Sequence, residues 1–144
     1  IGQKQQNDSE LWYMIDGSVI NNLPDTWFLH ERFILLPLNK WNHEYTKVNI
    51  GGITCDNSDY YNSETHVNQV YLPAHKDDEE APLMLGFFHT GAYQDALSGV
   101  GGVKHCLIPS PKHILVSKND QGEVSHWIHR EAQDVESMLS ILGY

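Results

Sequence analysis

The sequence predicts a mainly β fold, a β-sandwich or partly open β-barrel, with a short helix near 91–99 and a C-terminal helix near 131–142. Short apolar segments rich in β-branched and aromatic residues recur along the chain, and turn residues separate them. Helical periodicity is confined to the two places named. With 144 residues, of which 40% are hydrophobic, the chain is long enough to bury a core of its own.

The candidate strands are short segments bounded by Gly, Pro, Asn or Asp. They cover residues 11–16, 32–38, 46–54, 67–72, 83–89, 103–108, 113–117 and 123–129. Between the last two, "NDQG" at 119–122 predicts a hairpin turn. Many short strands at this spacing are typical of a sandwich or barrel.

The two candidate helices differ in length and in the strength of their pattern. "GAYQDALSG" (91–99) ends in glycine and suffices for about two turns. "EAQDVESMLSILGY" (131–144) places apolar residues on one face, which predicts core packing. These residues are Ala132, Val135, Met138, Leu139 and Leu142.

Charge and hydropathy exclude some partners. Nineteen acidic residues oppose nine Lys and Arg, giving a formal charge of −10, so a nucleic-acid partner is not expected. An acidic field suits a small cationic substrate, although solubility is the simpler explanation. No apolar run approaches the ~20 residues of a membrane helix. Without a visible targeting signal we expect a cytoplasmic protein, with residues 1–10 as a polar leader and 11–144 as one domain.

The two cysteines and nine histidines leave several chemistries open. Cys55 and Cys106 could form a disulfide, although two reduced thiols are simpler. Taken alone, Cys55 could also be a metal ligand or a small buried residue. His126 and His129 would point to opposite faces of a strand, so no metal site is predicted.

The surroundings of Cys55 favour a site. In "GGITCDNSDYYN" (51–62) an apolar, glycine-containing run ends at Cys55, and polar residues follow. This places the thiol at the end of a strand, with Asp56 beside it and Asp59 three positions further on. Asp56 could instead be a solvated loop acid or a turn residue, and Asp59 could simply cap the turn.

"GGITCDNSDYYN", followed about thirty residues later by "LGFFHTGAYQDALSG", resembles the C-terminal domain of the alanine-racemase-like, pyridoxal-phosphate-dependent decarboxylases. That group includes ornithine, diaminopimelate and arginine decarboxylases. Three stretches are similar to the biosynthetic arginine decarboxylases in particular, and the similarity runs from about residue 11 to the end. They are "NNLPDTW" (21–27), "LPL" (36–38) and "LGFFHTGAYQ" (85–94).

The resemblance implies the second domain of a two-domain enzyme whose other domain, a (β/α)8 barrel, holds pyridoxal 5'-phosphate. It implies a homodimer or higher homo-oligomer with active sites at the subunit interface, and an isolated domain that is inactive. The implied reaction converts L-arginine to agmatine and CO2, in arginine catabolism and in polyamine and spermidine biosynthesis. The resemblance also allows a requirement for Mg2+.

The resemblance assigns roles to five residues of this chain. Cys55 is implied as the proton donor to the substrate's α-carbon in the neighbouring subunit's site. Asp56 is implied to face the substrate's distal cationic group. Asp59 is expected to bind substrate, to orient the Cys55 loop or to cap the turn. Tyr93 is implied to reach the cofactor phosphate with its hydroxyl, and Gly91 to permit the turn before it.

Two alternatives to arginine decarboxylation remain. After residue 99 the chain continues "VGGVKHCLIPSPKHILV", where some arginine decarboxylases have a longer insert. The substrate could therefore be ornithine, lysine, diaminopimelate or carboxynorspermidine with the same mechanism. The chain could also be a non-catalytic β-sandwich interaction module.

Overall fold

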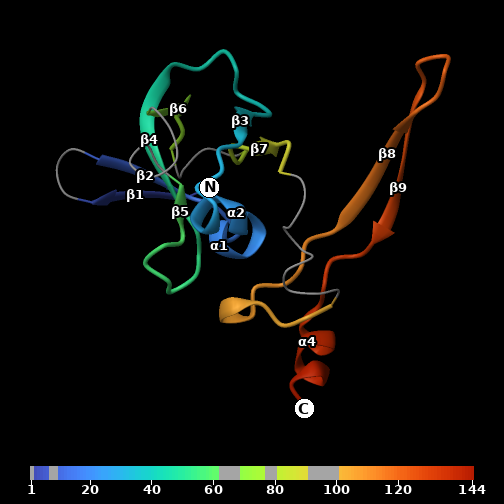
Figure 1. Ribbon diagram of the computed structural model, residues 1–144. Helices are drawn as coiled ribbons and strands as arrows, with labels where there is room; N and C mark the ends of the chain where they lie inside the picture. The colour runs from blue at the N-terminus through green and yellow to red at the C-terminus, as the bar shows by residue number, and fades with distance from the viewer. Residues whose placement is uncertain (1, 7–9, 62–68, 77–80, 91–100) are drawn as a thin grey trace. The chain divides into compact units, whose positions relative to one another are not determined.

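The computed structural model describes residues 2–6, 10–61, 69–76, 81–90 and 101–144 (Figure 1). The chain divides into two compact units, Ile1–Leu97 and Ser98–Tyr144, and each is described by itself. Strands predominate in the described residues, and their sheets do not close into a barrel. The prediction of a mainly β fold with sheets that are not fully closed is confirmed, and the helix predicted near 91–99 lies outside the described residues.

The described residues of the first unit form short strands and two very short helices. They are β1 (Gly2–Gln6), β2 (Glu10–Met14), α1 (Val19–Asn22), α2 (Pro24–Phe28), β3 (Ile34–Pro37), β4 (Tyr45–Gly51), β5 (Tyr60–Tyr61), β6 (Val70–Pro73) and β7 (Leu85–Phe88). The second unit contains a 3-10 turn, a hairpin and a helix. These are η1 (His105–Leu107), β8 (His113–Lys118), β9 (Val124–Arg130) and α4 (Val135–Ile141).

Strand β4 is the centre of the first unit. It pairs in parallel with β2 and antiparallel with β5 and β6, and β1 extends the sheet beyond β2. Its β-branched residues Thr46, Val48 and Ile50 alternate along the strand, as the two-residue period of a sheet requires. Residues 48–51 are all buried because β4 has neighbours on both sides there.

The hydrophobic core of the first unit forms around β4. Tyr13, Ile50, Tyr61 and Leu72 are at most 1% exposed, and the apolar area that they remove from water is the main favourable contribution to the fold. Tyr13 buries a hydroxyl as well, which donates to the Pro73 carbonyl at 3.1 Å. The core also includes Val19, Leu23, Phe33, Val48, Val70 and Leu83.

Several elements differ from the sequence predictions. Gly2–Gln6, expected as a polar leader, forms β1 and pairs with β2. Helices α1 and α2 were not predicted, since they span only four and five residues. The strand expected at 103–108 is wrong: η1 lies there. Cys106 and Leu107 have φ values of 55° and 54°, which are incompatible with a strand.

The hairpin of the second unit agrees with its prediction. Strands β8 and β9 pair antiparallel, and Asn119 closes the turn by accepting from the N–H groups of Gln121 and Glu123. Gly122 supplies the positive φ of 87° that the turn requires. Among the described residues, no helix has the length and apolar character needed to cross a lipid bilayer.

Helix α4 is shorter than predicted and begins after residue 134. Asp134 is its N-cap and accepts from the Ser137 N–H at 2.7 Å, and this hydrogen bond lowers the pKa of the Asp134 carboxyl. Met138 is buried, whereas Val135 and Leu139 are exposed. Leu142 is also exposed, and Ala132 precedes the helix. The predicted core face is therefore correct for Met138 only.

Tyr61 makes the fold less stable at alkaline pH. Its ring packs edge-on against Phe87 and its hydroxyl donates to the Phe33 carbonyl at 3.2 Å. Burial raises the pKa of Tyr61 above its ordinary value of 10.0, against a smaller opposing effect of the Arg32 charge. A raised pKa in the folded state stabilises the fold below the unfolded pKa, and that contribution is lost as pH rises through the folded value.

We therefore expect the free energy of unfolding to fall above about pH 10, and Tyr61→Phe to flatten this fall. At neutral pH the variant should lose about 1 kcal/mol with its hydrogen bond. Urea titrations between pH 8 and pH 11 measure both effects. Tyr144→Phe, at a residue that is 90% exposed, is the control and should keep the parent slope. An unchanged slope in Tyr61→Phe contradicts the prediction.

Candidate functional site

The loop between β4 and β5 carries the predicted site residues. Its base is closed by the Gly52 N–H, which donates to the Asp59 carbonyl at 2.8 Å. Both of these residues are buried, whereas residues 55–58 are exposed. The loop therefore has a fixed base inside the first unit and presents Cys55 and Asp56 to the outside.

The Asp59 carboxylate is the buried centre of this loop and is 5% exposed. Its Oδ1 accepts from the Ser18 hydroxyl at 3.1 Å and from the N–H groups of Val19 and Ile20 at 2.7 and 3.2 Å. Its Oδ2 accepts from the N–H and the hydroxyl of Thr54 at 3.0 and 2.6 Å. These five donors compensate the cost of burying a carboxylate. The geometry favours the loop-orienting role among the three expected for Asp59.

Gly52 makes room for this carboxylate. A Cβ at position 52 would lie 2.3 Å from the carboxyl carbon and from both carboxylate oxygens of Asp59. Contacts that short do not occur, so any other residue would displace the Asp59 side chain. Gly52, the second glycine of "GGITCD", is therefore needed because a larger residue would not fit there.

Asp56 stabilises the turn at the tip of the loop through one of its two carboxylate oxygens. Its Oδ1 accepts from the Ser58 N–H at 2.7 Å, and its backbone carbonyl accepts from the Asp59 N–H at 3.1 Å. This is the local bonding typical of an aspartate in a turn. Among the described residues no hydrogen bond reaches Oδ2, and the side chain is exposed, so a cationic group from outside could approach it.

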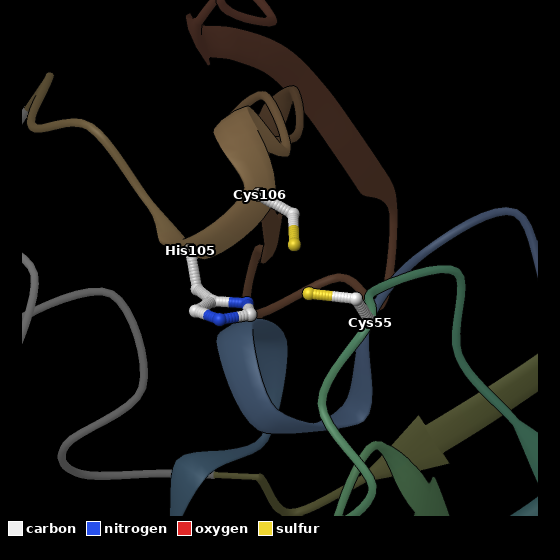
Figure 2. A group of neighbouring side chains, drawn as sticks. All are labelled: Cys55, His105 and Cys106. Carbon is white, nitrogen blue, oxygen red and sulfur yellow. The ribbon is translucent and has the colours of Figure 1, made fainter.

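Both cysteines are exposed. Cys55 lies on the loop after β4 in the first unit, and His105 and Cys106 are consecutive residues of η1 in the second unit (Figure 2). His126 and His129 lie on β9, where both are exposed. Cys55 is thus not the small buried residue that it could have been.

The other predicted site residues, Gly91 and Tyr93, lie outside the described residues. The structure adds three participants that the sequence did not single out: Ser18, Gly52 and Thr54. A hydroxyl side chain just before a helical segment is a recognised N-cap signal and could have pointed to Ser18. Its link to Asp59 spans 41 positions and has no local signal.

The chemistry of the loop can be stated from its side chains. A thiol can donate a proton and recover it from solvent, and a carboxylate can bind a guanidinium or an ammonium group. Residues 52–59 contain no Lys or Arg. The segment carries two aspartates, so its charge suits a cationic group better than a phosphate.

Comparisons of the sequence identify similar proteins. The family model described as "Pyridoxal-dependent decarboxylase, C-terminal sheet domain" matches residues 1–78. The biosynthetic arginine decarboxylase of Vibrio vulnificus is 30% identical over 132 residues, 88% of this chain and 20% of the relative. That of Prochlorococcus marinus is 27% identical over 137 residues, 92% of this chain and 20% of the relative. The chain thus spans about a fifth of the length of these relatives.

Comparisons of the structure give the same fold. A crystal structure of diaminopimelate decarboxylase has a TM-score of 0.72 at 19% identity, covering 98% of this chain and 32% of that one. A crystal structure of an Aquifex aeolicus protein has a TM-score of 0.72 at 15% identity, covering 98% and 30%. In both, the similarity extends over nearly all of this chain and under a third of the larger protein.

Gly52→Ala tests the packing at the base of the loop. The added methyl group would displace the Asp59 carboxylate from its donors, and we expect the free energy of unfolding to fall by about 2–4 kcal/mol. Gly17→Ala is the matched control, because its Cβ would meet only the end of the Asn22 side chain at 3.2 Å. Urea denaturation of both variants measures the difference. Equal losses in the two variants would mean that Gly52 has no special role.

Proposed function

The chain belongs to the pyridoxal-dependent decarboxylases, as their C-terminal sheet domain, and we propose that it completes the active site of an enzyme that converts L-arginine to agmatine and CO2. The observation that carries the proposal is the Cys55–Asp56 pair, exposed at the tip of a loop whose base is fixed by Asp59. The names of the relatives support arginine as the substrate.

In this proposal Cys55 supplies a proton. Pyridoxal 5'-phosphate, when bound, provides the electron sink that makes loss of CO2 feasible. The Cys55 thiol then delivers its proton to the substrate's α-carbon and is reprotonated from solvent, which its exposure permits. Its place beyond the buried loop base lets it reach a site formed largely by another domain.

Asp56 selects the substrate through its cationic end. Its carboxylate accepts one hydrogen bond within the loop, through Oδ1, and Oδ2 pairs with the guanidinium of arginine. The net charge of −10 favours a cationic substrate in the same sense. Ornithine, lysine and carboxynorspermidine, which carry an ammonium at that end, and diaminopimelate, which carries an ammonium beside a carboxylate, are the alternative substrates. Asp59, fully hydrogen-bonded inside the fold, holds the loop and does not itself contact the substrate.

The wider assignments stay predictions from the family resemblance. These predictions are that a barrel domain holds the cofactor, that the enzyme assembles as a homodimer, and that its product is used in polyamine synthesis. They also include a requirement for Mg2+ and the cofactor-binding roles of Gly91 and Tyr93. Sedimentation of the full-length polypeptide and assays with and without EDTA would test assembly and the metal.

Cys55→Ala tests the proton donor in the full-length polypeptide that carries this domain. Removing a positioned acid should lower kcat for arginine decarboxylation by about 10²-fold or more. Release of CO2 and formation of agmatine are the measurements. Cys106→Ser is the control, because it removes the other exposed thiol and should keep the parent rate. Unchanged turnover in Cys55→Ala would refute the catalytic assignment.

Asp56→Asn tests substrate recognition while keeping the Oδ1 acceptor of the Ser58 N–H. Loss of the charge-assisted pair should lower kcat/KM for arginine by about 10- to 100-fold, chiefly through KM. Asp120→Asn, in the exposed hairpin turn, is the control and should leave kcat/KM unchanged. Assays of the parent on ornithine, lysine and diaminopimelate accompany it. A parent that prefers one of these would overturn arginine as the substrate.

A further inference from the structure

Ser18 has two roles at the entrance of α1. Its side chain is fully buried, and its hydroxyl donates to Asp59 Oδ1 at 3.1 Å. The same oxygen accepts from the Asn21 N–H at 3.2 Å, which makes Ser18 the N-cap of α1. One hydroxyl thus joins the start of α1 to the carboxylate at the base of the Cys55 loop.

The segment around Ser18 holds the loop on both sides of its exposed tip. Before the tip, the Ile53 N–H donates to the Gly17 carbonyl at 3.0 Å. After the tip, Asp59 accepts from the Val19 and Ile20 N–H groups and from Ser18. Residues 55–58 lie between these anchors and are exposed. Residues 17–20, which precede Cys55 by more than thirty positions, therefore hold the backbone on both sides of it.

We propose that Ser18 is a positioning residue for Cys55, acting through Asp59 with Thr54 on the other side of the carboxylate. This inference rests on the proposed function, in which Cys55 delivers a proton to a defined carbon. Proton transfer requires the donor within hydrogen-bond reach of its target, so a small shift of the loop lowers the rate of that step. Substrate binding through Asp56 depends less on this placement, because an ion pair tolerates more variation in distance.

Ser18→Ala removes the hydroxyl, and Thr54→Val removes the opposite hydroxyl while keeping the volume. In the full-length polypeptide we expect each to lower kcat for arginine by about 10-fold or more, with KM within about twofold of the parent. Ser18→Thr keeps the hydroxyl and should restore most of the rate. Thr54→Val keeps the test valid if Ser18→Ala does not fold.

Thr26→Val is the matched control. Thr26 is fully buried and its hydroxyl donates to the Leu23 carbonyl at 2.7 Å. The variant therefore loses a buried hydroxyl hydrogen bond in the same region without touching Asp59. It should keep the parent kcat at temperatures where all variants are folded.

Hydrogen exchange of this chain supplies a readout that needs no substrate. Ser18→Ala should raise the amide exchange rates of residues 53, 54 and 59 by about 10-fold, whereas Thr26→Val should leave them unchanged. Three results would overturn the inference. The first is an unchanged amide exchange rate in the loop of Ser18→Ala, and the second is faster exchange in that variant with an unchanged kcat. The third is a loss of kcat in Thr26→Val equal to that in Ser18→Ala. If the parent decarboxylates none of the amino acids tested, the proposed function fails, while the exchange result still decides whether Ser18 holds the loop.

Discussion

A carboxylate in the interior of a protein needs hydrogen-bond donors in place of water, and the local structure around Asp59 is arranged to supply them. Backbone N–H groups at the start of α1 meet one oxygen, and Thr54 meets the other. Gly52 leaves the space that the carboxylate occupies. Because these groups come from separate segments, the same interaction that compensates the buried charge also fixes the geometry of the loop between β4 and β5.

This arrangement separates the supporting residues of the loop from its exposed residues. The residues that bear the charge and the packing are buried at the loop base, while Cys55 and Asp56 are exposed at its tip. In the proposed function, this pair acts on a substrate held by another part of a larger enzyme, so its own domain needs no deep pocket. Membership of the pyridoxal-dependent decarboxylases agrees with such a division, since this chain spans about a fifth of its relatives.

Features that depend on residues close together in the sequence could be predicted, whereas features that depend on residues far apart in the sequence could not. Strands β2, β4, β8 and β9 could be predicted because each is a short segment rich in β-branched and aromatic residues with turn residues at its ends. The Cys55–Asp56 pair could be found because its residues are adjacent. Helix α1 is too short to show a period, and the strand expected at 103–108 failed because positive φ values have no clear sequence signal. The role of Ser18 depends on a partner 41 positions away, which one sequence does not reveal.

The parallel pairing of β2 with β4 has a consequence for the order of folding. Parallel neighbours need a long crossover, and here residues 15–44 connect the two strands and contain α1. The bonds from Asp59 to residues 18–20 join positions 39 to 41 apart, so the entropy of closing that loop must be offset before they form. We therefore expect the Cys55 loop to reach its native shape after the sheet has assembled, which makes it sensitive to errors in strand register elsewhere in the unit.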